Sequence, residues 1–195
     1  AGDRLAVGAQ FDDGAGNDSN AVGAAYLFSF SDTEFNGGTL ESTIGKGYTG
    51  GKDVDVANLN DDIFFGSAIS LNGAGDRLAV GAPLDGGAGN PSNDAIGGAA
   101  YLFSFTDTDF TGGSLESTIG LGYTGGKNID TANLNTSSFG TSMSLNSAGD
   151  QLAVGSGGAA YLFTFTDTDF NGGTLESAIG KGFTGGKNLD VANLD

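Results

Sequence analysis

The sequence contains no cysteine, no histidine and no tryptophan among its 195 residues, and only 2 prolines. Without thiols or imidazoles it has no disulfide, no Cys/His zinc site and no histidine-based catalytic triad. Basic residues are also scarce, because 7 Lys and Arg stand against 24 Asp and Glu, for a net charge of −17. A chain this acidic repels polyanions, so we expect no nucleic-acid partner.

Long apolar runs are absent as well. No stretch of 18 apolar residues occurs, so we expect no membrane insertion. The chain shows no signal peptide and opens with AGDRLAVGA in place of Met, so we expect a segment cut from a longer chain. Hydrophobic residues still make up 38% of the sequence, which is enough for a core, and the acidity therefore does not predict disorder.

One unit occurs three times in the sequence. AGDRLAVGA at Ala1 returns unchanged at Ala74 and as AGDQLAVGS at Ala148, and each copy continues with GAAYLF and a glycine-rich stretch. The loops 10–22 and 83–97 are nearly absent from the third copy. The repeats are 1–60, which lacks its first strand, 61–135, and 136–195, which has the shortened loop.

A strand-like segment precedes the second and third copies, at 65–71 and 139–145, and has no counterpart before the first. We expect either a longer parent chain or a neighbouring subunit to supply it. Near-identical units of this kind pack on one another through one repeated surface.

The apolar pattern is that of β-strands. Tyr26 and Phe28 share one face and Ala25 and Leu27 the other, and neither face is charged, so we expect this strand between two layers. In the middle copy the strands are expected at 64–71, 76–82, 98–106 and 114–119. Asn-Gly pairs at 36–37, 72–73 and 171–172 indicate tight turns. No segment predicts a helix, and 53–60 fits a short turn.

A repeated four-stranded antiparallel unit, apolar on both faces, predicts an all-β fold of tandem β-propeller-type blades. Three blades are too few for a ring, since propellers have about 4–8. The three repeats therefore form either part of a closed propeller or an open blade array.

Several short motifs resemble the FG-GAP repeat of integrin α subunits and many bacterial surface proteins. Phe65-Gly66 is followed by Gly81-Ala82-Pro83 after a Leu-Ala-Val strand, and then by a Tyr-Leu-Phe strand. The near-exact duplication also resembles long secreted, adhesin-like bacterial repeat proteins. The resemblance implies β-propeller blades on a bacterial cell surface or outside the cell. The blade-packing residues that it implies are Phe65, Gly66, Gly81, Ala82, Pro83, Phe139 and Gly140.

The sequence departs from that family at its calcium loop. Many FG-GAP blades carry D-x-D-x-D-G between their first two strands, whereas this chain has Asn72-Gly73-Ala74-Gly75. That connection is too short and too poor in carboxylates to surround Ca²⁺, so the family's calcium residues are not carried over.

Two other loops are rich in oxygen ligands and glycine. Such loops suit Ca²⁺, but the same composition also suits a solvated loop in which Asn, Asp and Gly permit turns. We expect no required cofactor, and Ca²⁺ is the cation that these loops would suit. The candidate ligands are Asp12, Asp13, Asp18, Asp85 and Asp94.

Three other sets of residues have side chains suited to catalysis, glycan attachment or ion pairing. The acidic pairs alternate along expected strand ends and suggest a glycosidase-like carboxylate pair, but their recurrence in every copy favours a structural role. These pairs are Asp32 and Glu34, Asp107 and Asp109, and Asp167 and Asp169. Asn17 and Asn135 match the N-glycosylation pattern, so glycans are candidate partners. The lysines in Gly-rich stretches are expected to pair with carboxylates, including across blade contacts.

The sequence thus favours a non-enzymatic, extracellular structural protein. We expect it to form a fibre or surface stalk with copies of itself, through one blade-to-blade contact that repeats without closing. The alternative is an adhesin or ligand-binding propeller that holds Ca²⁺ or a glycan in the loops 10–22 and 83–97.

Overall fold

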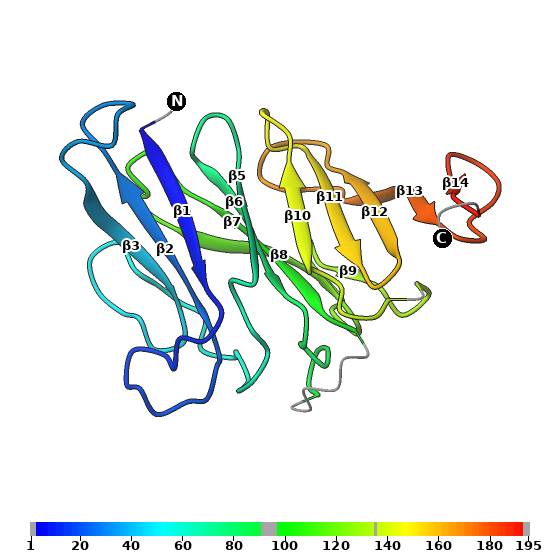
Figure 1. Cartoon of the computed structure of the whole chain (residues 1–195), viewed down its shortest axis with the longest axis horizontal. Coiled ribbons are helices and arrows are strands. Elements are labelled where there is room, and N and C mark those ends of the chain that lie inside the picture. The colour runs from blue at the N-terminus through cyan, green and yellow to red at the C-terminus, as the bar shows by residue number, and fades with distance from the viewer. Residues whose placement is uncertain (1–2, 91–96, 135, 193–195) are drawn as a thin grey trace.

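The computed structural model describes residues 3–90, 97–134 and 136–192. These residues form three stacked β-sheets (Figure 1). They contain no helix, and so no helix that could cross a membrane. The first sheet comprises β1 (Arg4–Ala9), β2 (Ala24–Ser29), β3 (Thr39–Gly45) and β4 (Val54–Asp55). The second comprises β5 (Ala68–Leu71), β6 (Arg77–Ala82), β7 (Ala99–Ser104), β8 (Ser114–Gly120) and β9 (Ile129–Asp130). The third comprises β10 (Ser142–Leu145), β11 (Gln151–Ser156), β12 (Ala159–Thr164), β13 (Thr174–Gly180) and β14 (Leu189–Asp190).

The all-β prediction is confirmed, but the purely antiparallel, four-stranded unit is wrong. Each sheet ends in a two-residue strand that pairs in parallel with its neighbour, as β9 does with β8. The second and third sheets therefore have five strands each. A glycine-rich loop leads into this short strand, and Gly125 and Gly126 in it have positive φ. Two residues are too few to show a sequence period, and this is why the strand was expected as a turn.

The first strand of the second unit is shorter than the expected 64–71. β5 begins at Ala68, because Phe64 (φ 59°) and Gly66 (φ 86°) interrupt the extended backbone. Phe65 instead forms an isolated parallel bridge with Gly23 of the first unit. The Phe-Gly pair thus belongs to the connection between two sheets.

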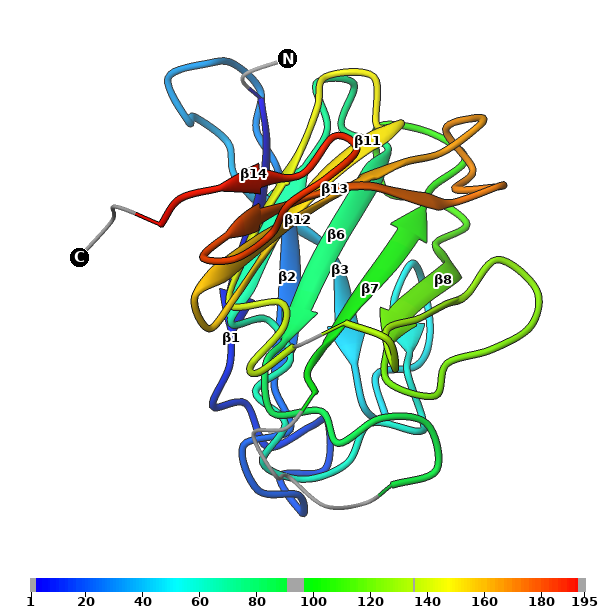
Figure 2. The same ribbon diagram turned by 90° about the vertical axis from the view of Figure 1, so that its right-hand side faces the viewer.

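The sheets pack face to face, and two apolar layers fill the spaces between them. The first layer joins Leu27 and Ile44 of the first sheet to Leu78 and Phe103 of the second. Figure 2, which looks along the stack from the third sheet, shows β12 and β13 in front of β6 and β7. Burial of each large apolar side chain contributes roughly 2 kcal/mol to the free energy of folding.

The second sheet is buried on both faces. Leu102 and Phe103 point to opposite sides of β7, and both side chains are fully buried. This confirms for β7 the expectation that a strand without a charged face lies between two layers. In β2, for which it was stated, Tyr26 and Phe28 are only partly buried, because the first sheet is covered on one face.

Each sheet carries one β-bulge at the same place. The pairing of β7 with β8 shifts between Leu102 and Phe103, which pair with Ser117 and Leu115 and leave Glu116 as the extra residue. Glu41 and Glu176 hold the same position in the other sheets. A bulge redirects the side chain of its extra residue, and this glutamate takes part in the contacts described next.

Candidate functional site at the joints between sheets

The term joint is used here for the interface between two neighbouring sheets. Glycines bring the backbones together at each joint. In the first joint a Cβ on Gly8 would overlap the carbonyl of Gly66, whose own amide donates to the Gly81 carbonyl within the second sheet (3.0 Å). In the second joint a Cβ on Gly81 would overlap the carbonyl of Gly140, whose own amide donates to the Gly155 carbonyl within the third sheet (2.9 Å). The joints therefore need glycine because two backbones meet where a side chain would stand.

The residues singled out as the packing motif surround these glycines. Phe65 is fully buried and its ring centroid lies 5.4 Å from that of Tyr101. Phe139 is also fully buried, and Ala82 and Pro83 are buried directly after the strand glycine. All the described motif residues lie at a joint or beside one: Phe65, Gly66, Gly81, Ala82, Pro83, Phe139 and Gly140.

An arginine also contacts the next sheet across each joint, at the end of the strands away from these glycines. Arg4 donates through Nε to the carbonyl of Thr108 (2.5 Å) and through Nη2 to Asp109 Oδ1 (2.6 Å). Arg77 makes the same contacts one sheet further on, with Thr168 and with Asp169 Oδ1 (2.8 Å). Both arginine side chains are largely buried. Each arginine thus fixes the lateral position of the next sheet by a charge-assisted bond and a carbonyl contact.

A lysine that pairs with the bulge glutamate also crosses each joint. Lys52 Nζ lies 2.5 Å from Glu41 Oε2 and 2.7 Å from the carbonyl oxygen of Asp109 in the next sheet. Hydrogen bonding from Lys52 lowers the pKa of Glu41. Lys127 forms the equivalent pair with Glu116. The expectation that these lysines pair with carboxylates is confirmed for Lys52 and Lys127. Both carboxylates lie in the lysine's own sheet, and the contact across the joint is to a carbonyl oxygen.

The acidic pairs do not alternate along strand ends, and this expectation is wrong. β7 ends at Ser104, and Asp107 lies in the turn that follows, where its Oδ1 accepts the amides of Asp109 and Thr111 (both 3.0 Å). The Thr111 bond in particular lowers the pKa of Asp107. Asp32 and Asp167 form the same turn, while Asp109 and Asp169 pair with the arginines. The two members of a pair therefore have different structural tasks.

Asp85 accepts hydrogen bonds from two tyrosine hydroxyls, at the end of the second sheet where the long loop begins. The side chain is 2% exposed, and its Oδ2 accepts from Tyr101 and from Tyr123 (3.0 Å). Its Oδ1 accepts the amide of Gly87 in the long loop (2.7 Å). Burial, together with the charge of Asp85, raises the pKa of both tyrosines, so both hydroxyls stay protonated as donors. The cluster attaches the loop to the sheet.

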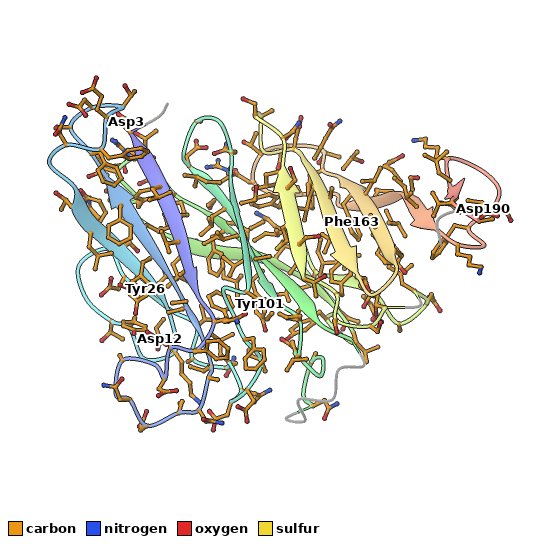
Figure 3. All side chains as sticks on the ribbon, in the orientation of Figure 1. Asp3, Asp12, Tyr26, Tyr101, Phe163 and Asp190 are labelled. Atoms are coloured by element: carbon orange, nitrogen blue, oxygen red, sulfur yellow. The ribbon has the colours of Figure 1, made fainter. Side chains whose placement is uncertain are left out.

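The first unit repeats this cluster with Asp12. Its carboxylate accepts from Tyr26, from Tyr48 (2.9 Å to Oδ1) and from the amide of Gly14 (2.8 Å). Asp12 and Tyr26 lie close together at the lower left of Figure 3. The third unit lacks the loop and its aspartate, and Phe183 stands where the second tyrosine would be. Loss of the carboxylate is matched by loss of one of the two hydroxyls that it would hold, in line with the cost of unpaired buried polar groups. The other tyrosine is retained as Tyr161.

The remaining calcium candidates do not gather around these aspartates. Asp13 Oδ1 accepts the amide of Ala21 (2.9 Å), Asp18 is exposed, and Asp94 lies outside the described residues. No group of three or more acidic side chains placed for a metal occurs in the described ranges. The calcium hypothesis remains a prediction. Of the glycosylation candidates, Asn17 is exposed in its loop, and Asn135 lies outside the described residues.

Two asparagines have a role that the sequence reasoning missed. Asn72 Oδ1 accepts the amides of Gly75, Asp76 and Arg77 at 2.9–3.0 Å, and its Nδ2 donates to Asp76 Oδ1. Asn146 makes the same bonds in the third unit. Gly75, and not the Asn72-Gly73 pair, takes the positive φ (85°). The repeated spacing N-x-A-G-D was the available signal for this turn.

The first sheet exposes the face that the other two bury. Phe35 is 60% exposed, whereas its counterparts Phe110 and Phe170 are fully buried. Leu5 and Val7 are 38% and 41% exposed, and their counterparts in β6 are fully buried.

The third sheet exposes the opposite face. Leu162 is only half-buried, whereas its counterpart Leu102 is fully buried. Here a shallow groove of about 410 Å³ is lined by residues that include Gln151, Ala153, Leu162 and Lys187. Comparison with known protein families and with curated proteins gave no match to this chain.

Proposed function

We propose that this chain is a non-enzymatic, extracellular structural repeat protein that forms a fibre or stalk by adding units of the same kind end to end. In this proposal the sheets are FG-GAP-like, β-propeller-type blades in an open array. The exposed face of the third sheet receives the exposed face of the first sheet of the next copy. This is a heterologous contact, and repetition of such a contact without closure produces a filament.

One observation carries the proposal: the two end faces are exposed versions of the two sides of the internal joints. The face with Leu5, Val7 and Phe35 corresponds to a face buried twice within the chain. The face with Leu162 corresponds to Leu27 and Leu102, which are both fully buried. Exposed apolar faces of this kind mark interaction surfaces, and here the joints themselves indicate the partner.

The polar contacts of the end joint can be named from the internal ones. Lys187 would reach the backbone of the next copy near Glu34, as Lys52 reaches Asp109. Gln151 stands where Arg4 and Arg77 stand in the internal joints, so it can donate a hydrogen bond but carries no charge. The end joint should therefore be weaker than the internal ones.

The proposal is tested by sedimentation velocity and electron microscopy of the purified chain over a range of concentrations. We expect reversible, concentration-dependent growth into filaments. The substitution Gln151→Arg should tighten association about tenfold, the size of one charge-assisted hydrogen bond. A chain that stays monomeric at millimolar concentration, or that forms closed discs, would overturn the proposal.

Two matched variants test the direction of the contact. Leu162→Asp disables the third-sheet face and Leu5→Asp disables the first-sheet face, so neither variant should associate alone. An equimolar mixture should form dimers only, since one intact face of each kind remains in the pair. Growth of either variant alone, or no dimer in the mixture, would contradict head-to-tail stacking.

A further inference from the structure

The three Asn-Gly pairs of the sequence lie in two different environments. Asn36-Gly37 and Asn171-Gly172 occupy the same turn in the first and third units, whereas Asn72-Gly73 lies between β5 and β6. An Asn-Gly pair can deamidate when the glycine nitrogen reaches the Cγ atom of the asparagine, and glycine allows this approach because it has no Cβ. The surroundings of each pair therefore decide whether the pair reacts.

The Asn72-Gly73 pair is held at both reacting groups. Asn72 is 6% exposed, and its Oδ1 accepts three backbone amides at 2.9–3.0 Å, which fixes the position of Cγ. The Gly73 amide donates to the carbonyl of Ser147 in the third unit (3.1 Å). Reaction at this pair therefore requires local opening of the turn and loss of these bonds.

The other two pairs are open to solvent at the attacking amide. Gly37 and Gly172 are exposed and have positive φ (59° and 58°). No acceptor for either amide occurs in the part of the chain that the structure describes. Each asparagine side chain makes one exposed hydrogen bond, from Nδ2 to the aspartate of its own turn (2.8 Å in both). These two pairs can react without any opening of a sheet.

The second unit provides an inert version of the same turn. Thr111-Gly112 stands in place of the Asn-Gly pair, the Thr111 amide donates to Asp107 Oδ1 (3.0 Å), and Gly112 has the same positive φ (62°). Both residues are exposed although their sheet lies in the middle of the stack, so the exposure of this turn does not depend on an open end. Threonine has no side-chain amide and cannot undergo this reaction.

Asn171 lies beside the contacts of the second joint. Thr168 and Asp169 precede it in the turn and accept hydrogen bonds from Arg77, and the Asp169 carbonyl also accepts from Lys127. The first joint has the equivalent contacts on the turn that carries the threonine. A change at Asn171 therefore affects the second joint and has no counterpart in the first.

We propose that Asn36 and Asn171 are sites of spontaneous deamidation, and that reaction at Asn171 loosens the second joint while the first stays intact. The glycine nitrogen bonds to Cγ and the Cγ–Nδ2 bond breaks. The proton lost from the glycine amide returns through water to the leaving group, which departs as ammonia. Water then opens the succinimide ring at either carbonyl carbon, which leaves Asp or isoaspartate.

Both products disturb the turn next to the joint. A carboxylate replaces the amide that donates to Asp167 Oδ2, so a hydrogen bond is exchanged for the repulsion of two like charges. Isoaspartate also adds a methylene group to the backbone of the turn, which shifts the Thr168 and Asp169 groups that Arg77 contacts.

Trypsin separates the three pairs, because they lie in the peptides 5–46, 53–77 and 128–181. The folded chain is incubated at slightly alkaline pH, and mass spectrometry of these peptides follows the conversion of each asparagine. We expect Asn36 and Asn171 to convert at least about tenfold faster than Asn72, since Asn72 reacts only after local opening. In concentrated urea the three rates should become similar. Equal rates in the folded chain, or a difference that persists in urea, would contradict the assignment of the sites.

The two arginines of the chain report the two joints separately. After incubation, the Arg77 Nε–H should exchange with solvent at least about tenfold faster, and the Arg4 Nε–H should be unchanged. Asn171→Thr, which copies Thr111, is the control and should keep both rates unchanged through the same incubation. Unchanged exchange at Arg77 in converted protein, or faster exchange in the control, would overturn the link to the joint. The measurements use dilute monomer and so do not depend on head-to-tail stacking.

Discussion

Lys127 Nζ lies 2.5 Å from Glu116 Oε2 in its own sheet and 2.7 Å from the carbonyl oxygen of Asp169 in the next. Lys187 repeats the pair with Glu176 at the end of the array, but its side chain is 72% exposed. The two lysines therefore share one intrasheet contact and differ by the contact across the joint.

Lys127→Met should lower the free energy of unfolding by about 1–2 kcal/mol, because it removes a bond from a charged donor to the next sheet and leaves Glu116 without its cation. Urea denaturation of dilute protein measures the change. Lys187→Met is the control and should cost less than about 0.5 kcal/mol, as exposed ion pairs do. Equal losses for the two variants would show that the contact across the joint contributes nothing.

Gly81→Ala should destabilise the chain by about 3 kcal/mol or more, because the new Cβ would overlap the Gly140 carbonyl and force two sheets apart. Thermal and urea unfolding both report the loss. In Gly155→Ala, the matched control, the Cβ would first meet Ser142 Oγ, which can rotate away. A Gly81→Ala variant as stable as that control would mean that the sheets can separate slightly without cost.

Asp85 and Tyr123 should show a coupling energy in a double-mutant cycle. Tyr123→Phe alone should cost about 1 kcal/mol, and Asp85→Ala about 2–3 kcal/mol because it leaves one buried and one half-buried hydroxyl without their acceptor. The double variant should cost at least about 0.5 kcal/mol less than the sum of the single variants. Strict additivity would indicate that the two groups act independently.

Stability should fall in acid partly through the turn aspartates. The folded pKa values of Asp32, Asp107 and Asp167 are lowered, mainly by hydrogen bonds from Asn36, Thr111 and Asn171 respectively. A lowered carboxyl pKa contributes stability that is fully present above the unfolded value of about 3.9 and is lost as pH falls through the folded value.

Carboxyl NMR titration should therefore place these three pKa values below about 3.9. Asp107→Asn should reduce the slope of stability against pH in this acid range and leave the slope near neutral pH unchanged. A pKa at or above the reference value for Asp107 would contradict the assigned hydrogen bonds.

The repeat, the strand positions and the burial of both faces of the central sheet follow from the sequence, because near-identical copies and period-2 apolar patterns are strong signals. The fifth strand could not be found, since two residues carry no period. The first strand was predicted too long, because nothing in the apolar pattern shows that Phe64 takes a positive φ.

The joints were harder to predict than the sheets. The lysine contacts were expected from charge balance alone, but the arginine contacts to Asp109 and Asp169 join residues more than 90 positions apart. Asp85 was considered as a calcium ligand, since composition does not reveal that two tyrosine hydroxyls would occupy its oxygen. The paired loss of this aspartate and its second tyrosine in the third copy was the available clue.

The combined loss of the loop aspartate and the second tyrosine indicates that the long loop is an insertion that a repeat can lack. In the third copy the loop is absent and Phe183 stands in place of the second tyrosine, while Tyr161 is retained. Transplanting 83–97 into the third repeat should conversely need Phe183→Tyr as a partner change. Each repeat can therefore carry or lack the loop independently of its neighbours, so that stacked sheets of nearly the same sequence display different loops.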